Sequence, residues 1–126
     1  MSVTSEVFPH PRAPMWYWIY YIITKPEEFQ TAKKYASKPV VLMFSADWNE
    51  ACKVMKKPFR EKALANRTAA VFCLVDVDKL NKKDSSIVAN YQVEALPTFV
   101  LLKDGQERER VVGAKMEEFS NMVKNI

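Results

Sequence analysis

The apolar positions of the chain follow two patterns, and their order predicts alternating strands and helices. An unbroken apolar run at 40–44 is typical of a central strand that is covered on both faces, and a second apolar run at 69–77, which contains Asp76 near its end, predicts another strand. Between these runs, apolar residues recur every three or four positions, which predicts a long helix that opens at 46–52 and ends near Asn66. The other predicted elements are a strand at 15–23, helices at 24–36 and around 87–91, strands at 98–102 and 107–112, and a last helix at 115–124.

Local signals support these elements and indicate the fold class. Thr24 and Glu27 form a capping box at the start of the first helix. Asp104-Gly105 between two strand-like runs is the strongest short signal of a β-hairpin. The strand–helix–strand order of the first half implies parallel strands with right-handed crossovers, and the hairpin adds antiparallel strands. We therefore expect a three-layer α/β domain with a central mixed sheet and a C-terminal β-hairpin.

The N-terminal part divides into a tail and a first strand. Prolines at positions 9, 11 and 14 predict an extended tail over residues 1–14, ahead of a domain that covers residues 15–126. The run Met15–Ile23 is far shorter than the ~20 residues that a transmembrane helix needs, so we expect no transmembrane span. Aromatic side chains on both faces of this strand suggest an additional contact with a partner or a membrane surface.

The composition is that of one small domain with little scope for metal chemistry. The chain has 126 residues, of which 48% are hydrophobic, and this content suffices for a single core. Two cysteines make neither a disulfide-rich scaffold nor a four-cysteine metal site, and the sequence has a single histidine, His10. We therefore expect no metal and no cofactor. The cysteine content favours a reducing intracellular compartment, either cytoplasmic or mitochondrial.

Basic residues exceed acidic ones, 19 to 15, and several of them line one flank of the long helix. This basic flank consists of Lys53, Lys56, Lys57 and Arg60. A solvated helix face is the favoured interpretation, and a contact with an acidic partner is the alternative. Neither an RNA-reading motif nor a glycine-rich phosphate loop accompanies the flank, so we expect no nucleic-acid partner.

Four segments in this order resemble the thioredoxin family, from about Ile22 to the C-terminus. They are Ala46-Asp47-Trp48 with Cys52, Val75-Asp76-Val77-Asp78, Ala95-Leu96-Pro97-Thr98-Phe99, and Lys103-Asp104-Gly105 followed by Val112-Gly113-Ala114. The resemblance implies a thioredoxin-like fold with a cis-proline loop at Pro97. The chemistry of that family is thiol–disulfide exchange.

The motif that carries this chemistry in the family is altered in the present chain. The family has W-C-x-x-C at a helix N-terminus, where the first cysteine attacks a substrate disulfide and the second resolves the mixed disulfide. This chain has W-N-E-A-C, so Asn49 stands at the attacking position and Cys52 at the resolving position. Met43 stands where the family usually carries a buried acid for proton transfer. The resemblance therefore implies that the dithiol cycle cannot run within this motif.

Without the first cysteine, the motif still suits the start of a helix. Asn49 belongs to the best N-cap residue types, and Glu50 in the first turn complements the helix dipole. The negative charge of Glu50 also opposes thiolate formation at Cys52.

The two cysteines have different predicted roles. We interpret Cys52 as a half-buried, small apolar side chain, whereas Lys53 and Lys56 favour the alternative of a reactive thiolate. Cys73 lies within a predicted central strand and is expected in the core. A Cys52–Cys73 disulfide stays open, because the sequence gives no distance between the two residues.

The resemblance also implies a groove beside the cis-proline loop where a protein could bind. With a cis bond before Pro97, the neighbouring backbone would form an exposed edge on which an extended peptide can pair. The expected groove is framed by Trp48, Asn49, Glu50, Leu96, Pro97, Gly113 and Ala114.

Two functions follow from these features, and the sequence leaves enzyme activity undecided. The first is a non-catalytic binding module, or a subunit of a larger assembly, that contacts a protein or an extended peptide through this groove. The second is a monothiol thiol–disulfide oxidoreductase in which Cys52 forms mixed disulfides that glutathione or another thiol resolves.

Overall fold

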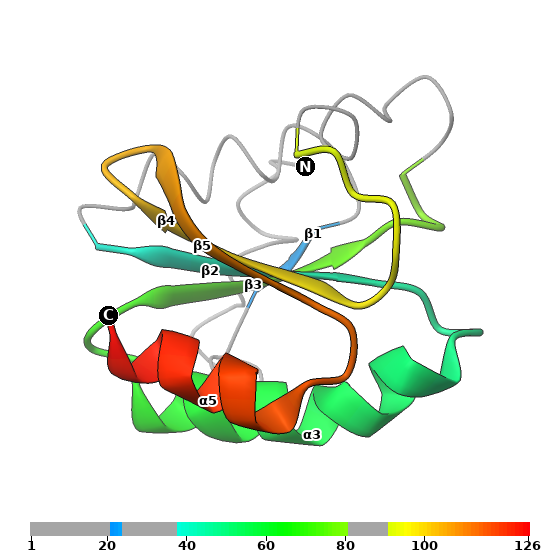
Figure 1. Ribbon diagram of the computed structural model, residues 1–126, viewed down its shortest axis with the longest axis horizontal. Helices are drawn as coiled ribbons and strands as arrows, with labels where there is room; N and C mark the ends of the chain where they lie inside the picture. Colours follow the sequence, from blue (N-terminus) through cyan, green and yellow to red (C-terminus); the bar gives the residue numbers. More distant parts are fainter. Residues whose placement is uncertain (1–20, 24–37, 81–90) are drawn as a thin grey trace, which may run out of the picture.

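The computed structural model describes residues 21–23, 38–80 and 91–126, and these residues build a five-stranded sheet (Figure 1). The strands are β1 (Tyr21–Ile23), β2 (Val40–Ser45), β3 (Val71–Asp76), β4 (Thr98–Lys103) and β5 (Gln106–Val112). They lie in the order β1-β3-β2-β4-β5, with parallel pairing among the first three and antiparallel pairing from β2 to β4 and from β4 to β5. The expected α/β fold with a central mixed sheet and a C-terminal hairpin is confirmed.

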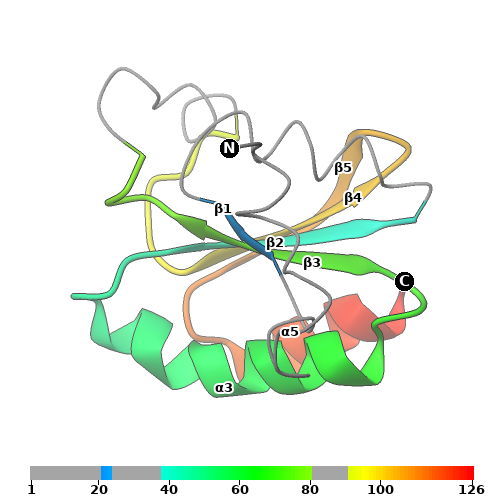
Figure 2. The ribbon, with the colours of Figure 1, turned by 180° about the vertical axis from the view of Figure 1, so that it is seen from behind.

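Two helices, α3 (Glu50–Ala65) and α5 (Met116–Lys124), cover one face of the sheet (Figure 1, Figure 2). No helix within the described ranges is long and apolar enough to cross a membrane. The predicted tail at 1–14, the helix at 24–36 and nearly all of the short helix around 87–91 lie outside the described residues. Of the aromatic run Met15–Ile23 only β1 is described, so the contact predicted for that run stays a prediction.

The two faces of the sheet have separate cores, because successive side chains of a strand point to opposite faces. Val41 and Met43 of β2 belong to the cluster on the helix side, whereas Leu42 and Phe44 belong to the cluster on the other face. Aromatic rings join the helices to the sheet on the helix side. They are Phe59 of α3, Phe72 of β3, Phe99 of β4 and Phe119 of α5.

The hairpin between β4 and β5 has the two-residue turn that the sequence predicts. Asp104 and Gly105 have φ angles of 54° and 77°, and positive φ at both positions matches the twist of the flanking strands. Further along, Leu101 pairs with Glu109 but Leu102 pairs with Glu107. Arg108 is therefore an extra residue, a β-bulge that the sequence did not predict.

Candidate functional site

The segments of the candidate site leave the sheet at one end, on the right in Figure 1. Ser45 at the end of β2 pairs with Asp76 at the end of β3, and Phe44 pairs with Thr98 at the start of β4. Thr98 in turn pairs with Val112, the last residue of β5. Four segments therefore lie at the same end of the sheet: the loops that follow β2, β3 and β5, and the segment that precedes β4.

Asn49 caps the N-terminus of α3, as predicted. Its backbone is extended, with φ −87° and ψ 120°, and its side-chain Oδ1 accepts a hydrogen bond from the backbone N–H of Cys52 at 3.0 Å. The N–H of Asn49 itself donates to the carbonyl of Ala46 at 3.1 Å. Glu50 is exposed in the first turn, where its carboxylate pairs with the Lys53 ammonium at 3.0 Å. The N-terminus of a helix binds anions readily. In α3 the Asn49 amide oxygen accepts one of its free N–H groups, and the Glu50 carboxylate complements its positive dipole end.

Cys52 is completely buried, so the prediction of a half-buried side chain was wrong. Its exposed fraction is 0%, and it belongs to the same cluster as Met43 and Met55. The residue lies one turn into α3, on the face that Met55, Phe59 and Ala63 also bury, and this face points at the sheet. The burial follows from the helical spacing of these apolar residues.

Cys73 lies in the other core. It belongs to the cluster with Leu42 and Val75 on the face of the sheet opposite to Cys52, and both cysteines are free. Burial raises the pKa of the Cys73 thiol to about 12. A disulfide between two residues on opposite faces of one sheet is incompatible with the short separation that the bond needs, so the fold answers the question that the sequence left open.

Trp48 is the most exposed large apolar residue among those described, with 66% of its surface accessible. Its indole Nε1–H nevertheless donates to Asp78 Oδ1 at 3.1 Å, which fixes the ring against the loop after β3. The preceding carboxylate, Asp76, holds that loop by accepting from the N–H groups of Asp78 and Lys79 at 3.1 and 3.2 Å. Asp78 was not among the predicted site residues, although its place directly after a central parallel strand is the signal that could have found it.

The segment before β4 meets the turn after β5. The Leu96–Pro97 peptide bond is cis, and the carbonyl of Pro97 accepts a hydrogen bond from the N–H of Gly113 at 2.8 Å. The Thr98 hydroxyl donates to the carbonyl of Ala95 at 2.6 Å, which closes the segment on itself. Gly113 has a φ of 96°, a conformation that favours glycine.

The predicted groove residues differ in accessibility. Trp48, Glu50 and Ala114 are exposed, Asn49, Leu96 and Gly113 are half-buried, and Pro97 is buried. Two exposed apolar side chains next to Ala114 were missed, Val112 with 42% and Met116 with 45% of its surface accessible. Their signal in the sequence was weak, because the strand pattern of the hairpin assigns Val112 to a buried face and the amphipathic pattern of the last helix does the same for Met116.

Charged side chains surround the start of α3. Lys56 donates to Asp47 at 3.0 Å, and this hydrogen bond together with the positive charge lowers the pKa of the Asp47 carboxyl. Lys57 and Arg60 of the basic flank are exposed. Among the residues that the structure describes, no group of three or more histidine, cysteine or acidic side chains lies close enough to hold a metal ion.

Comparisons with known proteins give one answer. The Thioredoxin family model matches residues 20–125. Thioredoxin H2-2 of Oryza sativa subsp. japonica is 41% identical over 101 residues, which are 79% of this chain and 71% of that protein. "Thioredoxin-2, mitochondrial" of Schizosaccharomyces pombe is 41% identical over 88 residues, 70% of this chain and 62% of that protein. The crystal structure of thioredoxin NaTrxh from Nicotiana alata superimposes with a TM-score of 0.71 at 34% identity, covering 82% of this chain and 89% of that one. The chain therefore belongs to the thioredoxin family.

Proposed function

We propose that this chain binds an extended segment of a partner protein at the candidate site and does not catalyse the dithiol–disulfide cycle. Its family, the thioredoxins, acts on protein substrates. One observation carries the proposal: the side-chain oxygen of Asn49 accepts the Cys52 N–H at 3.0 Å, at the place where the family pattern has its attacking sulfur.

Thiol–disulfide exchange requires a thiolate that a substrate disulfide can reach. An amide side chain has no such sulfur and cannot form the mixed disulfide. The remaining sulfur of the motif, Cys52, is 0% exposed and lies among apolar neighbours that include Met43. Attack by Cys52 would therefore require the start of α3 to open.

The candidate site offers a partner apolar surface next to a fixed backbone. Trp48 and Val112 expose 66% and 42% of their surfaces, and the indole of Trp48 is held by its hydrogen bond to Asp78. An exposed aromatic ring of fixed orientation is a typical anchor in protein interfaces. The partner that suits this surface is an extended segment with apolar side chains.

The alternative function is monothiol exchange through Cys52, which the redox chemistry of the family favours. Reduction of insulin in the presence of dithiothreitol tests it. We expect the wild-type rate to equal the background rate of dithiothreitol alone, and Cys52→Ala and the control Cys73→Ala to leave it unchanged. Turnover above background that disappears in Cys52→Ala would establish a monothiol enzyme and contradict the proposal.

The binding arm uses a peptide that cannot exchange disulfides, the S-carboxymethylated insulin B chain. We expect Trp48→Ala to weaken its binding about tenfold or more, as is usual for an aromatic hot spot. The matched control is Leu64→Ala, which truncates another exposed apolar side chain, 42% accessible, near the far end of α3. Equal losses in both variants, or no binding by the wild type, would contradict the assignment of the site.

The compartment and the wider assembly are part of the proposal. Free cysteines at positions 52 and 73 and a relative named as mitochondrial support a reducing compartment, cytoplasmic or mitochondrial. The domain proposed for residues 15–126 would use the aromatic run Met15–Ile23 as a second contact in a larger assembly. Cell fractionation together with the size of the native complex tests both points, and a freely secreted monomer would contradict them.

A further inference from the structure

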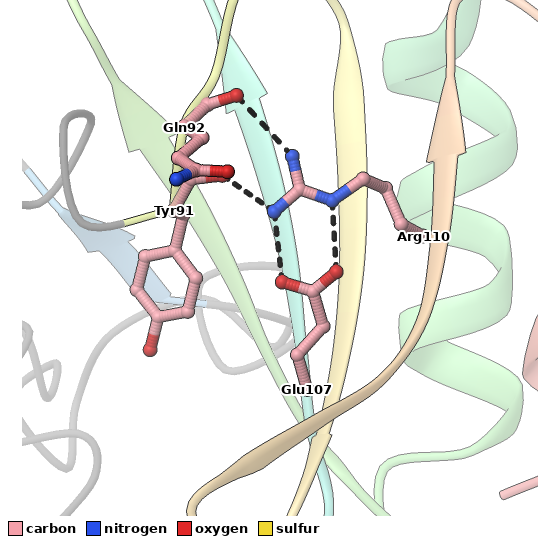
Figure 3. Close-up of polar contacts among 4 residues, drawn as sticks. All are labelled: Tyr91, Gln92, Glu107 and Arg110. Atoms are coloured by element: carbon pink, nitrogen blue, oxygen red, sulfur yellow. Dashed lines mark hydrogen bonds and ion pairs between the residues drawn. The ribbon is translucent and has the colours of Figure 1, made fainter.

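One side chain of β5 holds the segment that leads into the candidate site. Arg110 reaches across to residues 91 and 92, several positions before Pro97 (Figure 3). We propose that Arg110 is a positioning residue, which fixes the segment 91–97 and thereby the shape of the peptide-binding surface. This inference rests on the proposed function, because it assigns a determinant of binding at the same site.

The guanidinium of Arg110 uses its donors on two sides. Towards the segment, Nη1 donates to the carbonyl of Gln92 at 3.4 Å and Nη2 donates to the carbonyl of Tyr91. Towards its own strand, Nε and Nη2 donate to the two carboxylate oxygens of Glu107, both at 2.8 Å. The bidentate ion pair fixes the plane of the guanidinium, so the remaining donors point at the backbone of the segment.

A β-bulge makes this arrangement possible. In a regular strand, residues three positions apart point to opposite faces of the sheet. Because Arg108 is an extra residue in β5, Glu107 and Arg110 come to the same face, opposite Leu102 and Val100 respectively. Leu102 and Val100 both belong to the core on the face away from the helices. The bulge is therefore the feature that turns a Glu-x-x-Arg sequence on a strand into an ion pair.

The residues that Arg110 binds need to be held. Gln92 has a φ of 51°, a left-handed conformation that is unfavourable for a residue with a side chain. Such a conformation persists when its surroundings determine it. The ring of Tyr91 packs on Phe44 with centroids 5.9 Å apart, and the guanidinium binds the carbonyls of both residues.

The segment is thereby fixed at both ends. At its far end, the carbonyl of Pro97 accepts from Gly113, and the Thr98 hydroxyl binds the carbonyl of Ala95. At its near end, Arg110 holds the residues on which the turn depends. Leu96, between these anchors, packs against the cores on both faces of the sheet. Release of the near end would let the backbone of residues 93–96 sample other conformations, and this backbone borders the proposed binding surface.

The test compares two arginines of the same strand. Arg110→Lys keeps the positive charge but loses the planar fork, and Arg108→Lys makes the same change at an exposed position. The first readout is amide hydrogen exchange over residues 91–98, and the second is the affinity for the carboxymethylated insulin B chain. Glu107→Gln is a milder third variant, because it removes the carboxylate and keeps the guanidinium.

We expect Arg110→Lys to leave residues 93–96 mostly open, so that their amides exchange at close to the rate of an unstructured segment, and to weaken peptide binding about tenfold, because the binding-competent population then falls to about a tenth. Glu107→Gln should move both readouts in the same direction by less, and Arg108→Lys should leave both unchanged. Exchange that stays within twofold of Arg108→Lys would overturn the positioning role. Exchange close to the unstructured rate with unchanged affinity would also overturn it, since the shape of the segment would then not determine binding. Failure of the wild type to bind the peptide would instead count against the proposed function, while the exchange data would still decide whether Arg110 holds the segment.

Discussion

The start of α3 and the segment before β4 lie at the same end of the sheet, but they use their polar groups in different ways. At the start of α3 the motif is closed on itself, because Asn49 caps the helix and Cys52 is buried. The segment before β4 is instead supported by β5, because Arg110 binds the backbone carbonyls of residues 91 and 92. Residues 94 and 95 of this segment are exposed. The backbone beside the proposed binding surface is therefore held by contacts that do not involve the W-N-E-A-C motif.

The largest effect should come from restoring the attacking sulfur. Asn49→Cys recreates W-C-x-x-C, and a thiolate at a helix N-terminus is stabilised by the helix dipole and by free N–H groups. We expect insulin reduction to rise clearly above background. The rate should stay about a hundredfold below that of a thioredoxin with the buried acid, because Met43 supplies no proton transfer and general acid–base catalysis contributes about 10²–10⁴-fold.

The matched control for this gain is Asn49→Ser, which keeps a capping oxygen and supplies no sulfur. Equal activity in the serine and cysteine variants would contradict the role assigned to position 49, because it would show that the missing sulfur there does not limit thiol–disulfide exchange.

A smaller effect is expected from removing the helix cap. Asn49→Ala deletes the oxygen that accepts the Cys52 N–H, and loss of an N-cap side chain costs about 1 kcal/mol of the free energy of unfolding. Urea denaturation at neutral pH measures the difference. Asn121→Ala, at an exposed position on α5, is the control, and it should leave the stability unchanged or raise it slightly. A cap variant as stable as the wild type would show that Asn49 does not hold the start of α3.

The smallest effect concerns the ion pair that supports the segment before β4. The hydrogen bond from Arg110 lowers the pKa of the Glu107 carboxyl below its ordinary value of 4.5. A carboxyl with a lowered pKa in the folded state stabilises the protein above its unfolded pKa, and this contribution disappears as the pH falls through the folded pKa.

Glu107→Gln should therefore cost about 0.5 kcal/mol at pH 7, as for a partly exposed ion pair. The difference from the wild type should shrink once the pH falls below about 4.5 and vanish in stronger acid. Thermal unfolding of both proteins between pH 7 and pH 3 checks this, with Arg108→Gln as the control. A difference that grows towards acid pH has the wrong sign for this account.

The sequence predicted the features that depend on local rules. The apolar runs located β2 and β3, Asp104-Gly105 located the hairpin turn, and the N-cap role of Asn49 followed from its residue type and position. Each of these features is determined by residues that are close together in the sequence.

Features that depend on pairs distant in the sequence could not be predicted. The extra residue at Arg108 has no composition signal, and without it Glu107 and Arg110 are expected on opposite faces of the strand. The depth at which Cys52 is buried depends on how closely α3 packs on the sheet, which the helical spacing alone does not give. The Trp48–Asp78 hydrogen bond joins two loops that are neighbours only because β2 and β3 are paired.

We propose that a substrate disulfide can reach neither thiol of the folded protein. The accessibility of Cys52 and Cys73 in the native protein tests this most directly. The measurement is alkylation by iodoacetamide at pH 7 under native conditions, followed by mass spectrometry, with the urea-unfolded chain as the reference. We predict that Cys52 and Cys73 both stay unmodified while the protein is folded and that both react on unfolding. Rapid modification of Cys52 in the folded protein would reveal a sulfur that substrates can reach and would contradict the account.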